Sequence, residues 1–344
     1  MWPSSLIANA GTPLMWASCF MLLFGNFILA HFEHWLIKRK HGPSLTVWNP
    51  MIPANYTSMF SGIGLLYIIQ PYLGAVYDEP FRYGLYVIGG LWLSTYLVTV
   101  LIEWPFVAKT AGLGLGKRSL TTTIWVQGVS NLGLILMVHL LGSVSALTGL
   151  RQVEPGEIKT VSGWVYYLAS EGGDVYRARL DGSTVEVVKS FDSEEGSSWT
   201  RITIEPTGKG DRARLLFRES TDATVVDDNV GSAAQAAPVE YWLSEDVANL
   251  GNLTSGFDST RKFRDDPVVY AGFWPREGLV INGDRYALET PFLDLQWRSP
   301  IVLPDGKVVA QFGETIVLID HEQGTVAQLA LGTGGDVLLD PQSK

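Results

Sequence analysis

Four long apolar stretches occupy the first 150 residues, and they constrain the fold of this chain more than any other feature. They run over about 14–37, 55–76, 83–108 and 121–147, and no charged side chain occurs between Met1 and Phe32. At about 1.5 Å per helical residue, each stretch can cross a hydrocarbon layer of roughly 30 Å. Trp and Tyr residues lie near the ends, as is typical of rings at a lipid–water interface. The sequence therefore predicts a membrane α-helical bundle of four transmembrane helices over residues 1–150.

The rest of the chain has a different composition. Residues 1–150 hold 7 Lys and Arg against 4 Asp and Glu, whereas residues 151–344 hold 18 against 31. The net charges are therefore +3 and −13. Phosphate backbones are bound by clustered Lys and Arg, which the acidic half lacks, so we expect no nucleic acid among the partners. Residues 151–344 are predicted to form a separate, water-exposed domain.

The basic residues of the short loops predict the direction of the chain in the membrane. Three basic residues lie at 38–40 and three more within 109–118, whereas the segment 78–82 has two acidic residues and one basic residue. Loops rich in Lys and Arg stay in the cytoplasm. We therefore expect a multi-pass protein of the cell (inner) membrane, with the N-terminus and the domain 151–344 outside the cytoplasm.

Short runs rich in β-branched and aromatic residues fill residues 151–344, and turns of Gly, Asp and Pro separate them. They predict strands over 161–169, 174–180, 184–188, 214–217, 239–243, 268–273, 279–281, 307–312, 315–319 and 325–330. The segment 221–238 is rich in small and polar residues and is predicted to be a long loop. An all-β domain is expected.

Two segments of this domain share one pattern. VYYLASEGGDVYRARLDGSTVEVV (165–188) and VVAQFGETIVLIDHEQGTVAQLAL (308–331) both predict three strands joined by turns, and LPDGKVVAQF (303–312) leads into the second. The pattern resembles the blades of TolB-like and quinoprotein-like β-propellers, which implies a propeller-like fold. At about 40–45 residues per blade the domain has room for roughly four. An incomplete or irregular propeller and a β-sandwich both stay open, and no cofactor is carried over from the resemblance.

Ionisable residues inside the predicted spans are the candidate site. His31, Glu33 and His34 lie near the end of the first stretch, and Glu103 lies near the end of the third, on the same predicted side. Together they predict a proton-relay site or a His and carboxylate metal site. The alternative is that Glu33, His34 and Glu103 reach water at headgroup depth and pair with nearby lysines.

Other polar groups have simpler explanations. Hydrogen bonds between helices account for the remaining polar side chains of the spans, which are Asn26, Gln70, Gln127, Asn131 and His139. His321 has no neighbouring Ser or Cys in sequence, so a nucleophilic triad is unsupported, and no catalytic residue is assigned.

Two functions from different classes follow. In the first, the outward β-domain binds a protein or an envelope component, and the helices are an anchor or a subunit of a membrane complex. In the second, the chain is a membrane-bound redox or proton-handling protein, or a metal-dependent enzyme, centred on the His and Glu residues. No cofactor is predicted, and the expected partners are the lipid bilayer and other membrane or envelope proteins. Transport is disfavoured, because the helix pairs show no internal repeat beyond similar length.

Overall fold

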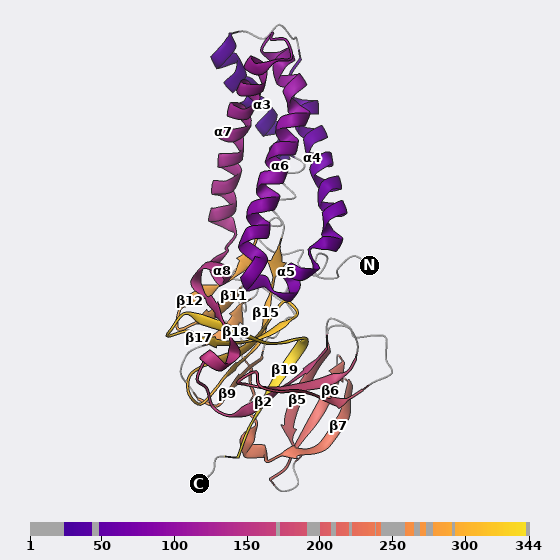
Figure 1. Ribbon diagram of the computed structural model, residues 1–344, viewed down its shortest axis with the longest axis vertical. Coiled ribbons are helices and arrows are strands. Elements are labelled where there is room, and N and C mark those ends of the chain that lie inside the picture. The colour runs from indigo at the N-terminus through magenta and orange to yellow at the C-terminus, as the bar shows by residue number, and fades with distance from the viewer. Residues whose placement is uncertain are drawn as a thin grey trace. The chain divides into compact units, whose positions relative to one another are not determined.

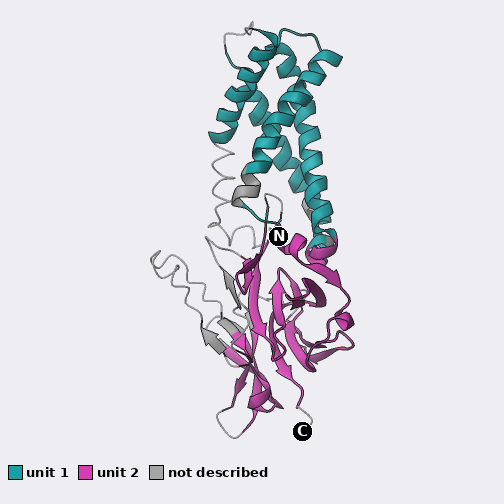
Figure 2. Ribbon diagram, turned by 90° about the vertical axis from the view of Figure 1, so that its left-hand side faces the viewer, with its two compact units in different colours: residues 1–76, 83–143, 289–294 teal, residues 77–82, 144–288, 295–344 magenta. Residues whose placement is uncertain are grey.

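A computed structural model describes residues 24–42, 48–169, 173–190, 200–207, 211–219, 222–237, 239–241, 259–264, 269–272, 278–290 and 293–341. The chain forms two compact units, coloured separately in Figure 2. The first, the helical unit, comprises residues 1–76, 83–143 and 289–294. The second, the β unit, comprises residues 77–82, 144–288 and 295–344.

The long helices of the helical unit run side by side (Figures 1 and 2). The α-helices along the chain are α3 (Asn26–His41), α4 (Met51–Ile69), α5 (Gly74–Asp78), α6 (Pro80–Thr110), α7 (Lys117–Leu141) and α8 (Ser145–Gly149). α3 ends in four basic residues, which suit the negative end of the helix dipole, and then in Gly42, whose positive φ of +92° favours glycine. Small and apolar side chains form the core between α3, α4, α6 and α7, among them Ala30, Ile37, Met51 and Val126.

The prediction of four transmembrane helices is wrong. Among the described residues only α6, with 31 residues, is both long enough and apolar enough to cross a membrane. The described part of α3 has 16 residues and rises only about 24 Å, and residues 14–23 of the first predicted span lie outside the described residues. α4 has 19 residues and includes the polar Asn55 and Ser58, and α7 opens with two charged residues and several polar ones. In the described residues, the other three helices are therefore too short or too polar to meet the requirements of a membrane span.

The β unit contains one curled seven-stranded sheet and smaller sheets around it. Its described strands are β1 (Arg151–Val153), β2 (Gly163–Leu168), β3 (Val175–Arg179), β4 (Val185–Lys189), β5 (Thr200–Pro206), β6 (Ala213–Glu219), β7 (Asp222–Gly231), β8 (Val239–Tyr241), β9 (Ser259–Lys262), β10 (Val269–Gly272), β11 (Gly278–Ile281), β12 (Asp284–Tyr286), β13 (Leu288–Glu289), β14 (Asp294–Leu295), β15 (Trp297–Val302), β16 (Val308–Phe312), β17 (Thr315–Asp320), β18 (Thr325–Leu331) and β19 (Thr333–Leu339). β13 and β14 reach into residues 289–294 of the helical unit. The largest sheet has the order β1-β18-β17-β16-β15-β9-β8, and a second has the order β19-β2-β3-β4.

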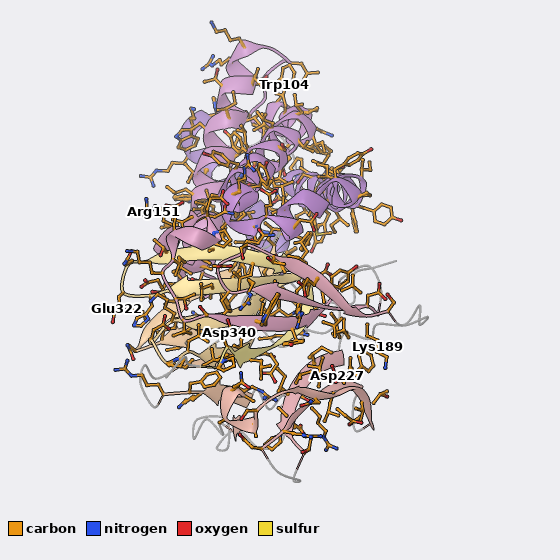
Figure 3. All side chains as sticks on the ribbon, turned by 60° about the horizontal axis from the view of Figure 1, so that its bottom comes forward. Trp104, Arg151, Lys189, Asp227, Glu322 and Asp340 are labelled. Carbon is orange, nitrogen blue, oxygen red and sulfur yellow. The ribbon has the colours of Figure 1, made fainter. Side chains whose placement is uncertain are left out.

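Three sheets of the β unit pack as layers. Alternate residues of β2 point to opposite faces, so Val165 and Tyr167 pack against the seven-stranded sheet through Leu318. Tyr166 and Leu168 pack on the other face, against the sheet β5-β6-β7. The sheet β19-β2-β3-β4 is therefore the middle layer, and its strand β2 is buried on both faces. Ionisable side chains such as Lys189, Asp227 and Glu322 are exposed at the surface of the unit (Figure 3).

The propeller-like arrangement is contradicted, although its local pattern is correct. Residues 165–188 form β2, β3 and β4, and residues 308–331 form β16, β17 and β18, each as an antiparallel meander. The two meanders lie in different stacked sheets, and β1 adds to β18 in parallel while β19 adds to β2. Strands from distant parts of the chain thus extend both sheets, and the described strands close no propeller. The predicted loop 221–238 is also wrong, because it contains β7.

One segment between two helices belongs to the β unit. Gln328 Nε2 donates to the carbonyl oxygen of Asp78 at 3.0 Å. The ring of Phe81 lies 5.1 Å from that of Phe312, which is fully buried and stacks at 4.3 Å on Trp297. The segment 77–82 comprises the end of α5 and the start of α6. It is therefore packed against the seven-stranded sheet of the β unit.

Candidate buried carboxyl site

Glu33 of α3 and Glu103 of α6 form the centre of a buried polar cluster in the helical unit. Their side chains belong to residues that are 0% and 1% exposed. Gln127 of α7 joins them, because its Nε2 donates to Glu33 Oε1 at 3.1 Å and to Glu103 Oε2 at 2.5 Å. Asn55 of α4 donates from Nδ2 to Glu33 Oε2 at 2.7 Å. Four helices therefore contribute to one site.

Ser58 of α4 contacts the fourth carboxyl oxygen of the pair, which is Oε1 of Glu103. Its hydroxyl lies 2.6 Å from Glu103 Oε1 and 3.0 Å from the carbonyl oxygen of Asn55. A hydroxyl has one hydrogen to donate, and both of these neighbours are acceptors if Glu103 is ionised. A proton on Glu103 Oε1 resolves this, because Ser58 then accepts from Glu103 and donates to the Asn55 carbonyl. The hydrogen-bond pattern favours a protonated Glu103.

The charge of the cluster leads to the same state. Within the described residues no Lys, Arg or His forms an ion pair with either carboxyl group. Two adjacent buried carboxylates without a cation repel each other and have both lost their water. One proton shared by the pair removes one of the two charges. A proton on the pair would therefore lower the electrostatic cost of the site.

The two histidines of the predicted site lie outside this cluster. His31 is exposed, and its Nδ1 hydrogen-bonds with the carbonyl of Phe27 at 2.9 Å. His34 is half-buried, and its Nδ1 has no hydrogen-bond partner. Among the described residues no group of three His, Cys, Asp or Glu side chains could hold a metal ion. The structure thus brings together the two carboxylates and separates them from both imidazoles.

Comparison with known proteins adds no relative. No protein family model, curated protein or solved structure matches this chain. The resemblance to propeller blades stays a prediction about two segments.

Sequence reasoning missed part of the site. It found Glu33 and Glu103, took Gln127 as a link between helices, and did not include Asn55 or Ser58. A signal was present: Asn55 and Ser58 lie three residues apart on α4, so they share one helix face. Asn131 donates to the Gln127 carbonyl at 2.9 Å, and Asn26 donates to Met59 Sδ at 3.1 Å, so both serve structure. The structure does not describe the side chains of Gln70 and His139.

The helical unit exposes many large apolar side chains although it buries a polar cluster beside its apolar core. Several large apolar side chains are at least two-fifths exposed on each of α4, α6 and α7, and others are about as exposed on α3. On α6 these are Leu85, Tyr86, Leu93, Leu97 and Leu101. An apolar surface of this extent is unfavourable in water and favourable in contact with lipid chains. The exposed faces of these helices are therefore rich in large apolar side chains.

Proposed function

We propose that this chain is a membrane protein whose helical unit takes up and releases one proton at the pair Glu33 and Glu103. The observation that carries the proposal is the bridge of Gln127 between two buried carboxyl groups that have no cationic partner in the described structure. Glu103 carries the proton in the resting state, on the oxygen that faces Ser58. Ionisable groups at membrane depth are costly, and where they occur they commonly belong to proton or ion pathways.

Release of the proton would change the packing of the helices. A second negative charge on the pair turns Ser58 toward Glu103 and away from the Asn55 carbonyl, and it increases the repulsion between α3 and α6. The affected side chains come from four helices, so protonation and helix packing are coupled. This makes the chain a proton-responsive component of the membrane. Residues His31 and His34 are not needed for the step.

Infrared difference spectroscopy of the full chain in detergent tests the proposal. The wild-type protein should show the C=O stretching band of a protonated carboxyl group, shifted in D₂O, which disappears as the pH is raised. Glu103→Gln should abolish the band, because the group that carries the proton is gone. Glu33→Gln should change the pH at which the band disappears, because the neighbouring charge is removed.

Glu79→Gln is the matched control, since Glu79 is a glutamate at the surface, paired with Arg82 at 3.1 Å. It should leave the band and its pH dependence unchanged. A wild-type spectrum without a titrating carboxyl band would show that the pair serves packing alone. A Glu103→Gln spectrum that keeps the band would show that Glu103 does not carry the proton.

A second candidate function is the binding of a protein or envelope component by the β unit. β4 is the last strand of its sheet, and in the described residues it pairs only with β3. Val185 and Val187 of β4 are 52% and 56% exposed. An edge strand with exposed valines can accept a further strand from a partner.

Co-purification in mild detergent tests this second function. We expect the wild-type chain to be isolated with a partner, and Val185→Lys combined with Val187→Lys to lose it, because lysines at an edge oppose strand addition. Val225→Lys is the control, since Val225 is 39% exposed on β7 in another sheet. A chain that is always isolated as a single monomer argues against this function.

A further inference from the structure

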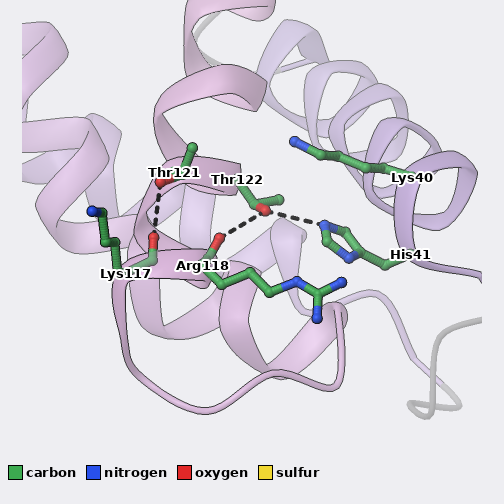
Figure 4. Close-up of a pocket in the computed structure, with 6 residues that line it drawn as sticks. All are labelled: Lys40, His41, Lys117, Arg118, Thr121 and Thr122. Atoms are coloured by element: carbon green, nitrogen blue, oxygen red, sulfur yellow. Dashed lines mark hydrogen bonds between the residues drawn. The ribbon is translucent and has the colours of Figure 1, made fainter.

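A basic pocket lies where α3 ends and α7 begins. It has a volume of about 470 Å³ and is lined by Lys40, His41, Lys117, Arg118, Thr121 and Thr122. Figure 4 shows Lys40 and His41 entering from α3, and Lys117 and Arg118 from the first turn of α7. Three of the six lining residues are permanent cations, and none is acidic. The cavity therefore offers donors and positive charge together.

The pocket is held in shape by its own contacts. His41 Nε2 hydrogen-bonds with Thr122 Oγ1 at 3.0 Å, which fixes the end of α3 against α7. The hydroxyls of Thr121 and Thr122 also donate to backbone carbonyls one turn earlier on α7, at 2.9 and 3.0 Å. Lys40 Nζ lies 4.7 Å from the ring centroid of Trp125. These contacts position the ring of His41 and the ammonium group of Lys40 without neutralising any charge.

The electrostatics of the pocket are unbalanced. Within the described residues neither Lys40, Lys117 nor Arg118 has an acidic partner. Partial burial, with Lys40 and Arg118 adding positive charge, lowers the pKa of His41. The first turn of α7 contributes a smaller positive field from its dipole. The region therefore carries a local excess of positive charge in a chain whose total charge is −10.

We propose that this pocket binds a phosphate group, carried either by an anionic lipid headgroup or by a free phosphate compound. The guanidinium group of Arg118 matches the geometry of phosphate oxygens, and the ammonium group of Lys40 supplies further donors from α3. A compact anion with several acceptor oxygens uses these donors at once, whereas a carboxylate has only two oxygens. A nucleic acid does not fit, because the basic residues form one small pocket and not a surface track.

Titration calorimetry on the full chain in non-ionic detergent, with inorganic phosphate as the probe, is the first arm of the test. Saturable binding is expected, and Lys40→Gln combined with Arg118→Gln should weaken it by roughly tenfold or more. Lys109→Gln is the matched control, because Lys109 also lies at a helix end of this unit and its Nζ is 5.7 Å from the ring centroid of Trp48. It should bind phosphate as the wild type does.

The second arm identifies the source of the phosphate. The same titration is made in nanodiscs of phosphatidylcholine, without and with phosphatidylglycerol. If phosphatidylglycerol abolishes the binding of inorganic phosphate, the lipid headgroup occupies the pocket; if binding persists in both, the ligand is a free phosphate compound. A further measurement needs no substitution. Phosphate should slow the chemical acetylation of Lys40 in the wild-type protein and should leave the acetylation of Lys109 unchanged.

Three results would overturn the proposal. The first is an absence of saturable binding in both arms. The second is a Lys40→Gln and Arg118→Gln protein that binds phosphate like the wild type. The third is an equal loss in Lys109→Gln, since that would mean general attraction of anions to a basic surface.

Discussion

Replacing Asp336 with alanine is expected to lower the free energy of unfolding of the β unit by about 3–5 kcal/mol. Asp336 of β19 is fully buried, and its Oδ2 lies 2.7 Å from Nη1 of Arg261 on β9, which is only 7% exposed. The same oxygen accepts from the backbone N–H of Ile204 at 2.6 Å. Alanine leaves the guanidinium of Arg261 buried without its counter-charge. Hydrogen exchange of the slowest amides in β16–β18 measures the loss in the full chain.

A surface ion pair is the control for this substitution. Asp340 pairs with Arg179, and both side chains are 32% exposed, so Asp340→Ala should cost only about 0–1 kcal/mol. Replacing the buried pair together, as Arg261→Met with Asp336→Leu, should recover most of the stability, because no charge is then buried. Equal effects of Asp336→Ala and Asp340→Ala would contradict the argument.

The same residue predicts a pH dependence. Burial raises the pKa of Asp336 to about 6, although Arg261 and the backbone N–H groups of Ile204 and Val337 act in the opposite direction. Between the ordinary carboxyl range near 4 and about 6, the folded state holds more protons than the unfolded state. The free energy of unfolding should therefore fall as the pH rises through this window, by at most about 3 kcal/mol. Asp336→Asn should remove this slope.

Residues Lys117 and Glu322 are expected to be labelled from opposite sides of the membrane. We propose that α6, the one described helix with the length and hydropathy of a membrane span, crosses the bilayer. The basic residues at 38–40 and 109–118 favour a cytoplasmic location for that end. The segment 77–82 precedes most of α6 and is packed into the β unit through Gln328 and Phe312. Residues 80–82 open α6 and belong to the β unit, so we expect them outside, and we expect the start of α7, which follows the other end of α6, inside.

Cysteine labelling in intact spheroplasts provides the measurement. In a Cys19→Ser background, Glu322→Cys should react fully with a membrane-impermeant maleimide, and Lys117→Cys should react only after permeabilisation. Both positions are exposed, so reactivity reports location and not burial. Arg39→Cys at the end of α3 is a second internal marker and should behave like Lys117→Cys. The reverse pattern, or equal labelling of all three cysteines, would rule out this topology.

The site shows why sequence reasoning reached some residues and not others. Glu33 and Glu103 were found because a charge inside an apolar stretch is costly and therefore conspicuous. The histidines next to Glu33 were joined to it by proximity along the chain. On a helix, however, successive residues are about 100° apart, so Glu33 faces the core while His31 and His34 face outward or sideways. Which helix faces Glu33 depends on packing, and that brought in Asn55 and Gln127.

The amino-acid sequence by itself determined the division into an apolar helical part and an acidic β-rich part, and it located many of the individual strands. The spacing of apolar residues and the local composition involve only a few neighbouring residues, so both can be recognised in the sequence. Only the tertiary structure decided how many helices meet the requirements of a membrane span, that the β meanders stack in layers instead of forming blades, and that β7 replaces a predicted loop. The layering of the β meanders depends on pairing between segments more than a hundred residues apart, such as β1 with β18 and β2 with β19. Burial and hydrogen bonding across such distances are properties of the folded chain as a whole.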